Sequence, residues 1–283
     1  MEPISRDEIR IAVGASLAED IGSGDLTTLA TVPENAHATA AMTAREPIVV
    51  AGLEFAMEVF HQLSRELDVI EQCADGHSLP PGSSLLNLRG PARAILTGER
   101  VALNFVQRLS GVATLTKTFV DAVAGTKAKI LDTRKTTPGW RRFEKYAVSC
   151  GGGSNHRFGL FDMVLIKDNH LAALRNESPN AVAAAVQRAR LAYPKLKVEV
   201  EADQLEQVQQ AVDAAADMIL LDNMSPEQLR AAVELVQGRL KLEASGGVNL
   251  STIRAIAETG VDFISVGAIT HSARAVDIGL DFK

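Results

Sequence analysis

The sequence contains very little cysteine. Its 283 residues include only 2 cysteines, Cys73 and Cys150. Two cysteines are too few for a disulfide framework, and neither lies in a CxxC or cysteine-histidine spacing typical of a metal site. No HExxH pattern is present either. We therefore expect the two side chains to be ordinary reduced thiols.

The sequence also lacks a membrane-spanning run, a secretory signal peptide and an excess of positive charge. Lys and Arg together number 29 against 35 for Asp and Glu, which gives a net charge of -6. General attraction to nucleic acid or to an anionic membrane surface is therefore not expected. These absences predict a cytoplasmic protein that binds neither a membrane nor nucleic acid. At 46% hydrophobic residues, the chain can still bury one large core or two modest ones.

From about residue 129 onward, short runs rich in Val, Ile and Leu alternate with stretches of helical spacing. The runs are KILD, DMVLI, KVEVE, DMILL, KLEAS and DFISV. Between them, Ser225, Pro226 and Gln228 form a helix N-terminal signal, and Gly238 and Gly260 stand where helix ends are expected. The alternation predicts parallel strands joined by helices, as an open sheet or as a barrel.

The first hundred or so residues follow a different pattern. One amphipathic helix is expected near residues 6–19, followed by the strand-like runs HATAAMTA, PIVVAGL, ELDVI and SLLNL. A long helix over about 94–123 connects this part to the β-α half. We predict an N-terminal domain over 1–110 and a catalytic domain over 111–271, with the tail 272–283 packing on the first domain.

Polar or glycine residues follow each of the six predicted strands of the second half. In α/β barrels, the carboxyl ends of the strands carry the functional groups. The strand ends carry Thr133, Arg134 and Lys135; Lys167; Glu201; Asp222; Ser245, Gly246 and Gly247; and Gly267 and Ala268. We expect these groups to meet in one site.

Positive charge is concentrated between Thr133 and His170 of this acidic protein. Lys and Arg stand at positions 134, 135, 141, 142, 145, 157 and 167, against acids at 144, 162 and 168. Arg134 and Arg157 can grip carboxylates or phosphates in a bidentate manner, while Lys135 and Lys167 act as point charges. The pattern predicts a cleft for a small polyanion. Paired surface cations are the alternative.

Two loops of small residues follow the last two strands. They are Ser245-Gly246-Gly247 and Ser265-Val266-Gly267-Ala268, at the customary phosphate position of α/β barrels. Glu201 and Asp222 would stand beside that phosphate, which favours Mg²⁺ held directly or through water. Pairing of these carboxylates with Lys or Arg is equally compatible with the sequence.

Other chemically active residues give weaker signals. Cys150 lies beside three glycines, but nothing in the sequence specifies an activated thiol. His156 and His170 lack a metal-ligand spacing, so hydrogen bonding to a substrate anion is the better interpretation. The loop EDIGSGD at residues 19–25 reads as a turn or helix cap, or else as an interface or lid.

A longer pattern is more specific than any of these motifs. The strings EDIGSGDLTT, GERVALNFVQRLSGVAT, DTRKTTPGWR, EKYAVSCGGGSNHRFGLFDMVLIKDNH, VEVE, ILLDNM, EASGGV and ISVGAITH occur in this order. Together they closely resemble the quinolinate phosphoribosyltransferases, type II phosphoribosyltransferases of NAD biosynthesis. The resemblance implies a pentosyltransferase with an N-terminal α/β sandwich domain and an incomplete α/β barrel of six or seven strands. It also implies a homodimer, and Mg²⁺ as the cofactor.

The resemblance implies a reaction between quinolinate and phosphoribosyl pyrophosphate that yields nicotinate mononucleotide, pyrophosphate and carbon dioxide. It assigns quinolinate binding to Arg134, Arg157, Lys167 and, from the partner subunit, Arg100, with Thr133 and His156 beside them. It assigns phosphoribosyl pyrophosphate and its metal to Lys135, Glu201 and Asp222, and the 5′-phosphate to the two small-residue loops. In two places the sequence departs from the family pattern, at Trp140 and Phe161, and neither departure removes a charged contact.

Three other interpretations remain open at this point. A related branch associated with molybdenum transport shares the TRKT-type motif, but the NHRFGL and IKDNH strings favour quinolinate. A lyase or aldolase would need a strand-end lysine, Lys167 or Lys135, to form a Schiff base. A non-catalytic nucleotide sensor would not need Glu201 and Asp222, which are both present.

Overall fold

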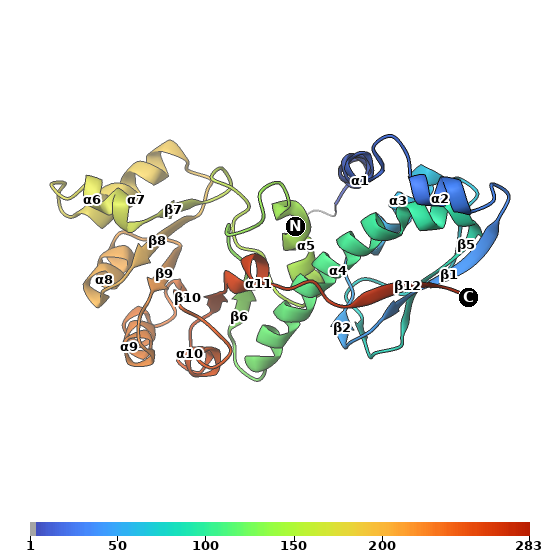
Figure 1. Ribbon diagram of the computed structural model, residues 1–283. Coiled ribbons are helices and arrows are strands. Elements are labelled where there is room, and N and C mark those ends of the chain that lie inside the picture. Colours follow the sequence, from blue (N-terminus) through green and yellow to red (C-terminus); the bar gives the residue numbers. More distant parts are fainter. Residues whose placement is uncertain (1–3) are drawn as a thin grey trace. The chain divides into compact units, whose positions relative to one another are not determined.

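The computed structural model describes residues 4–283 and divides into two compact units. The first unit comprises the described residues up to Lys117 together with 137–152 and 272–283. The second comprises Thr118–Thr136 and Gly153–His271. Figure 1 labels most of the elements of both units.

The first unit is built on a four-stranded antiparallel sheet in the order β12-β1-β5-β3. Its strands are β1 (His37–Ala44), β3 (Asp68–Gln72), β5 (Ser84–Pro91) and β12 (Ile278–Phe282). A two-stranded sheet pairs β2 (Ile48–Val49) with β4 (Ser78–Leu79). The helices are α1 (Arg6–Ile21), α2 (Leu26–Thr31), α3 (Leu53–Leu63), α5 (Arg141–Cys150) and most of α4 (Ala92–Ala122). Because β12 pairs with β1, the last residues of the chain complete one edge of this sheet.

The expected helix near residues 6–19 and the long helix over 94–123 are confirmed as α1 and α4. The strand predicted for PIVVAGL is wrong beyond Val49, since α3 begins at Leu53. Gly52 immediately before α3 has a φ of 96°. A Cβ there would lie 2.8 Å from Leu109, so this turn into the helix requires glycine.

The cation-rich segment that follows TTPG forms α5 and lies in the first unit. Phe143 of α5 packs against Phe55 at a ring distance of 4.9 Å, and Trp140 stacks on Phe105 at 5.2 Å. The aromatic rings of this segment therefore belong to the core of the first unit. The expectation that the cations at 141, 142 and 145 face the same cleft as Arg134 fails for two of them. Arg142 pairs with Glu8 at 3.2 Å, and Lys145 is fully buried.

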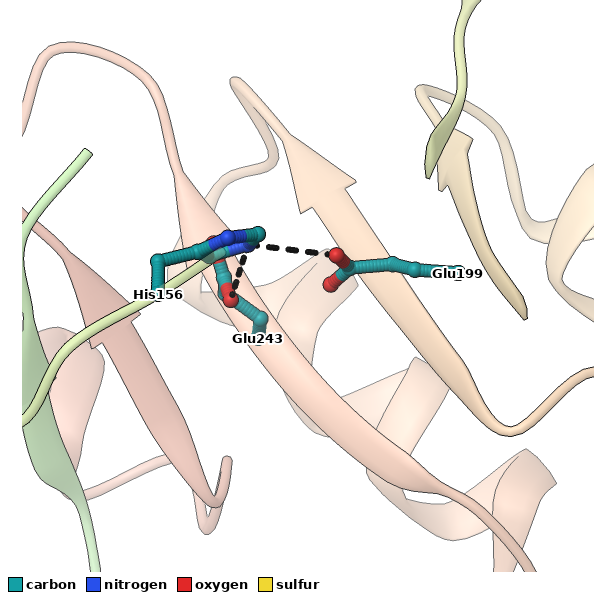
Figure 2. Close-up of side chains that lie close together, drawn as sticks. All are labelled: His156, Glu199 and Glu243. Carbon is teal, nitrogen blue, oxygen red and sulfur yellow. Dashed lines mark ion pairs between the residues drawn. The ribbon is translucent and has the colours of Figure 1, made fainter. Parts of the chain in front are cut away.

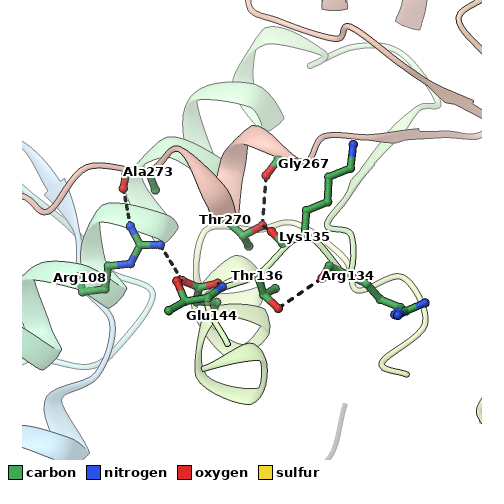
Figure 3. A network of polar contacts seen from close by, with 9 residues as sticks. Arg108, Arg134, Lys135, Thr136, Glu144, Gly267, Thr270 and Ala273 are labelled. Carbon is green, nitrogen blue, oxygen red and sulfur yellow. Dashed lines mark hydrogen bonds and ion pairs between the residues drawn. The ribbon is translucent and has the colours of Figure 1, made fainter. Parts of the chain in front are cut away.

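A buried ion pair holds the start of α5 (Figure 3). Glu144 has no exposed surface and accepts a hydrogen bond from Arg108 Nη2 at 2.6 Å. It also accepts bonds from the backbone N–H and hydroxyl of Thr137, at 3.1 and 2.8 Å. Arg108 additionally donates to the carbonyl of Ala273. Because a buried carboxylate is costly unless it is paired, this network fixes the position of three segments distant in sequence.

The second unit carries a six-stranded sheet in the order β6-β11-β10-β9-β8-β7, and every pairing in it is parallel. The strands are β6 (Lys129–Leu131), β7 (Val164–Ile166), β8 (Val198–Ala202), β9 (Met218–Asp222), β10 (Lys241–Ser245) and β11 (Phe263–Ser265). The helices are α6 (Asp168–Ala173), α7 (Ala181–Ala192), α8 (Leu205–Asp213), α9 (Pro226–Val236), α10 (Ile253–Ala257) and α11 (Ala268–His271). This parallel sheet agrees with the incomplete α/β barrel expected from the sequence.

Local signals explain where these elements begin and end. Ser225 caps α9 by accepting from the N–H of Gln228, and Pro226 occupies the first turn, as predicted. The helix ends at Gln237, which adopts the left-handed conformation one residue before the expected Gly238. Because side chains alternate along a strand, Glu199 and Glu201 of β8 lie on one face, as do Glu243 and Ser245 of β10.

No helix in the described part of the chain has both the length and the hydropathy needed to span a bilayer.

Candidate active site

A cleft of about 660 Å³ opens at the carboxyl ends of the strands of the second unit. Each of the six predicted strand ends contributes at least one predicted site residue to this cleft. The predicted site residues that line the cleft are Thr133, Arg134, Lys135, His156, Arg157, Lys167, Glu201, Asp222, Ser245, Gly246, Gly247 and Ser265. Sequence reasoning did not assign a role to four further lining residues, Leu165, Leu220, Asn223 and Glu243.

The turn after β6 places Arg134 and Lys135 at the rim of the cleft. The Thr133 hydroxyl accepts a hydrogen bond from the backbone N–H of Lys135 at 3.0 Å. The Thr270 hydroxyl donates to the carbonyl of Lys135 at 2.8 Å, as Figure 3 shows. Both bonds hold the backbone, which leaves the two cationic side chains to face the cleft.

The loop that carries His156 and Arg157 is anchored by Asp132, which is fully buried at the end of β6. Asp132 accepts bonds from Asn155 Nδ2 at 2.6 Å and from the N–H of His156 at 2.9 Å. Burial, and after it the nearby charge of Arg134, lowers the pKa of Arg157. Two guanidinium groups that disfavour each other's charge are suited to an anionic ligand that neutralises both.

Three titratable groups meet at the inner side of the cleft (Figure 2). His156 Nε2 lies 3.2 Å from Glu199 Oε2 and 3.3 Å from Glu243 Oε2, and both glutamates are fully buried. Burial of the imidazole disfavours its charge, but the contacts with Glu199 and Glu243 prevail and raise the pKa of His156 to about 10. Neither glutamate was assigned a role from the sequence. Their two-residue spacing from Glu201 and Ser245 was the signal that could have found them.

Two carboxylates lie on the β8 and β9 side of the cleft. Glu201 Oε2 accepts from Lys167 Nζ at 2.7 Å, so the pairing left open by the sequence is formed in this structure. Burial, and then the charge of Glu201, raises the pKa of Asp222. Asn223 donates to Asp222 Oδ2 at 2.8 Å and orients that carboxylate. A cation placed beside two carboxylates that repel each other would be stabilised, so the donor set fits a hard metal ion such as Mg²⁺.

The small-residue loops contribute unequally to the cleft. Gly246 has a φ of 92°, and a Cβ there would lie 2.1 Å from Oδ1 of Asn223. A side chain at position 246 would therefore clash with Asn223, whether or not a phosphate is bound in the loop. In the second loop, the backbone N–H of Val266 donates to the carbonyl of Leu131 at 2.9 Å, so that donor is already used.

Five residues to which the sequence analysis gave a role are not among those that line the cleft. Val266 is buried, while Gly267 and Ala268 stand at the start of α11. Arg100 is exposed on α4 in the first unit. His170 lies in α6 and accepts from the N–H of Lys167 at 2.8 Å, which makes it a helix cap.

The N-terminal loop motif also forms caps. Gly22 ends α1 with a φ of 52°, and Asp25 begins α2 by accepting from the N–H of Thr28 at 3.0 Å. Thr97 donates to the other oxygen of Asp25 at 3.0 Å. These contacts agree with the helix-cap interpretation of the motif.

Cys150 lies in the first unit, outside the residues that line the cleft. Burial, and then the charge of Asp75, raises the pKa of its thiol to about 12. We expect Cys150→Ala to keep kcat and KM within about twofold, because the thiol is neither ionised nor placed for nucleophilic attack. Steady-state kinetics of the variant test this. A large loss of kcat with an unchanged melting temperature would show that the thiol takes part in the chemistry.

Comparison with known proteins gives matches over nearly the whole chain. The model of the quinolinate phosphoribosyl transferase N-terminal domain matches residues 25–110, and that of the C-terminal domain matches residues 112–281. A nicotinate-nucleotide pyrophosphorylase [carboxylating] of Mycobacterium leprae is 46% identical over 281 residues, which cover 97% of each chain. A probable enzyme of the same name from Bacillus subtilis is 43% identical, covering 93% of this chain and 89% of its own. The solved nicotinate-nucleotide pyrophosphorylase of Francisella tularensis has a TM-score of 0.93 at 43% identity, covering 99% of this chain and 98% of its own.

Proposed function

The chain belongs to the quinolinate phosphoribosyltransferase family, and on this premise we propose the reaction that its cleft catalyses. The phosphoribosyl group of phosphoribosyl pyrophosphate is transferred to quinolinate with decarboxylation. The products are nicotinate mononucleotide, pyrophosphate and carbon dioxide, so the enzyme acts in de novo NAD biosynthesis. The observation that carries the proposal is the convergence of Arg134, Lys135, Arg157 and Lys167 on one cleft of an acidic protein.

The cations match the charge of the two substrates. Quinolinate carries two adjacent carboxylates, and the donor carries a phosphate and a pyrophosphate. Arg134 and Arg157 offer planar donor pairs to the carboxylates, and Lys167 adds a third cation. In a partly enclosed cleft these charges interact more strongly than in water, so they hold the acceptor and set its orientation.

The transfer step requires orientation and charge placement more than proton transfer. The pyridine nitrogen attacks the anomeric carbon as pyrophosphate leaves, and positive charge develops on the ribose ring. Lys135 stabilises the departing phosphates, while the carboxylates of Glu201 and Asp222 face the developing charge. Holding both substrates in line can contribute about 7 to 11 kcal/mol.

Mg²⁺ is the cofactor that the family implies, and the donor set described above fits it. Glu201 and Asp222 would hold the ion, directly or through water, beside the phosphates of the donor. The ion would supply charge stabilisation for the pyrophosphate leaving group. For Glu201 to take part, its carboxylate must be shared with Lys167, with which it pairs at 2.7 Å.

Decarboxylation then follows from the chemistry of the product ring. Once the nitrogen is alkylated, the pyridinium can hold the electron pair left behind by the adjacent carboxylate as an ylide. The electron pair takes up a proton from water at the same carbon, which completes nicotinate mononucleotide. No dedicated base is needed for carbon dioxide to leave.

Two rival functions are weakened by the same geometry. A Schiff-base lyase that used Lys167 would need its amine neutral to attack a carbonyl, yet Lys167 is engaged in an ion pair with Glu201. A nucleotide sensor has no need for two carboxylates beside the cations, and Glu201 and Asp222 both line the cleft.

We also propose that the protein acts in the cytoplasm as a homodimer in which Arg100 reaches the acceptor site of the partner subunit. The support is the exposure of Arg100 on α4, outside the residues that line the cleft of its own chain. A mixture of two inactive variants, Arg100→Ala and Asp222→Asn, should regain activity if sites are shared. No recovery after co-refolding would contradict the sharing.

An acceptor comparison tests the proposed function. Purified protein with phosphoribosyl pyrophosphate and Mg²⁺ should release pyrophosphate with quinolinate and at most trace amounts with nicotinate, because one carboxylate leaves part of the cation set unpaired. Equal release with both acceptors would show that the second carboxylate is not recognised. Release with neither would reassign the acceptor.

A further inference from the structure

The cluster of His156, Glu199 and Glu243 is a deeply buried set of titratable groups beside the cleft. The imidazole is 8% exposed and both glutamates are 0% exposed. Among the described residues, the two Oε1 atoms have no hydrogen-bond partner, and the two Oε2 atoms have only their close contacts with Nε2. Buried carboxylates with so few donors are costly to a fold. They therefore call for a functional explanation.

Both ring nitrogens of His156 are occupied by the protein. Nε2 faces the two glutamates, as Figure 2 shows, and Nδ1 accepts a hydrogen bond from the backbone N–H of Arg157 at 2.7 Å. The backbone N–H of His156 is itself held by Asp132 at 2.9 Å. No ring nitrogen is thus left to bind a substrate carboxylate directly, contrary to the interpretation of His156 drawn from the sequence.

The Nδ1 contact decides where the ring proton lies. An acceptor nitrogen carries a lone pair, so the proton of the imidazole is on Nε2 and is directed to the glutamates. The contacts with Glu199 and Glu243 raise the pKa of His156, so the three coupled groups together bind a second proton, and burial also raises the pKa of Glu199. Because an N–H on Nδ1 would face the backbone N–H of Arg157 at 2.7 Å, we assign this second proton to a carboxylate. Both observations are satisfied without protonating Nδ1.

The same three side chains offer one imidazole and two carboxylates within 4.8 Å of one another, a set that suits a transition metal. A metal would need the Nε2 lone pair, and the Arg157 contact requires that this nitrogen carry the proton. The Nδ1 of a ligating histidine donates to an oxygen, whereas here Nδ1 accepts. The geometry therefore favours a cluster held together by hydrogen bonds, without a metal ion, over a metal site.

We propose that His156 is a positioning residue for Arg157, and that Glu199 and Glu243 position His156. The glutamates fix the imidazole through Nε2, and Nδ1 fixes the backbone of Arg157. Since the guanidinium of Arg157 lines the cleft, this chain of contacts sets where one carboxylate of the acceptor binds. The part that concerns the acceptor rests on the proposed function, whereas the contacts within the cluster do not.

Kinetics of Glu199→Gln and Glu243→Gln test the positioning role. We expect the KM for quinolinate to rise about tenfold or more, while kcat and the KM for phosphoribosyl pyrophosphate stay within about threefold. The reason is that each variant loses an interaction that stabilises quinolinate equally in the ground state and in the transition state. Glu206→Gln, an exposed change on α8, is the matched control and should change neither constant. Equal loss for both substrates would indicate only a weakened fold and would overturn the proposal.

Two variants of the imidazole separate its nitrogens. Asn at position 156 can keep the acceptor for the Arg157 N–H, so His156→Asn should retain more quinolinate affinity than His156→Ala. If the ring instead bound the acceptor, both variants would lose the same contact and would bind quinolinate equally weakly. That result would overturn the role assigned to Nδ1.

Nitrogen-15 NMR of labelled histidine tests the cluster without any substrate. The sequence has 6 histidines, and His156→Asn identifies the signal of interest. We expect the tautomer with the proton on Nε2, unchanged on adding quinolinate. Three results would each overturn the proposal. They are a proton on Nδ1, a change in the nitrogen chemical shifts of His156 when quinolinate binds, and one bound zinc ion per chain that is lost in both glutamine variants. Protein that shows the expected tautomer but binds no quinolinate would instead refute the proposed function.

Discussion

Replacing Arg134 by alanine is expected to weaken quinolinate binding by about 2 to 5 kcal/mol, because the variant leaves a carboxylate of the acceptor without its partner in a cleft. Arg134 lines the cleft and stands close enough to Arg157 to lower the pKa of that side chain. Direct calorimetric titration with quinolinate measures the loss. The affinity for phosphoribosyl pyrophosphate should change far less.

The matched control is Arg188→Ala in the same unit. Arg188 lies on α7, and its side chain is 57% exposed beside Glu177. Pairs of this kind contribute about 0 to 1 kcal/mol, so quinolinate affinity should be unchanged. If Arg134→Ala behaved like this control, the dicarboxylate site would have to be placed elsewhere.

Asp222→Asn should lower kcat by about 30- to 1,000-fold, equivalent to about 2 to 4 kcal/mol of transition-state stabilisation. The amide has nearly the same shape as the carboxylate but no charge to face the ribose or a metal ion. The concentration of Mg²⁺ needed for half-maximal rate should rise as well. A wild-type magnesium profile in the variant would show that the ion is held by the substrate alone.

The acid limb of the pH–rate profile tests the same carboxylate. Because the pKa of Asp222 is raised by burial and by Glu201, this group takes up a proton at a higher pH than an ordinary aspartate. Activity that depends on its charge is therefore present above that raised pKa and is lost as the pH falls through it. Asp222→Asn should lack this inflection, whereas Asp203→Asn, an exposed change after β8, should keep it.

The sequence allowed most of the second unit to be predicted because its signals are local. Apolar runs such as MILLD are buried on both faces in a parallel sheet, and MILLD is followed by the capped helix α9. The polar residue at the end of each run then falls at one edge of the sheet, as Glu201 and Asp222 do. Knowing the strand ends was enough to find most of the cleft.

The parts that could not be predicted depend on contacts between distant segments. Glu199 and Glu243 sit in the middle of apolar strands, and only the fold brings them to His156. The cations of α5 follow Arg134 closely in sequence, yet Lys145 is buried in the first unit. Charge counted along the chain overstates the charge of the cleft for this reason.

The missed helix α3 has a similar cause. Its first residues continue the apolar run IVVAGL, which has the composition of a strand. Gly52 breaks that run in a left-handed conformation, and the following buried residues Ala56 and Phe60 keep helical spacing. The β-propensity of these residues alone favours a strand, whereas their packing in the folded protein stabilises the helix.

One labelled substrate tests the central claim most directly. Quinolinate carrying ¹³C in the carboxylate next to the ring nitrogen is incubated with the protein, phosphoribosyl pyrophosphate and Mg²⁺, and labelled carbon dioxide and pyrophosphate are measured together. We predict equal amounts of both products, with the unlabelled carboxylate retained in nicotinate mononucleotide. Pyrophosphate without labelled carbon dioxide, or label retained in the nucleotide, would contradict the account.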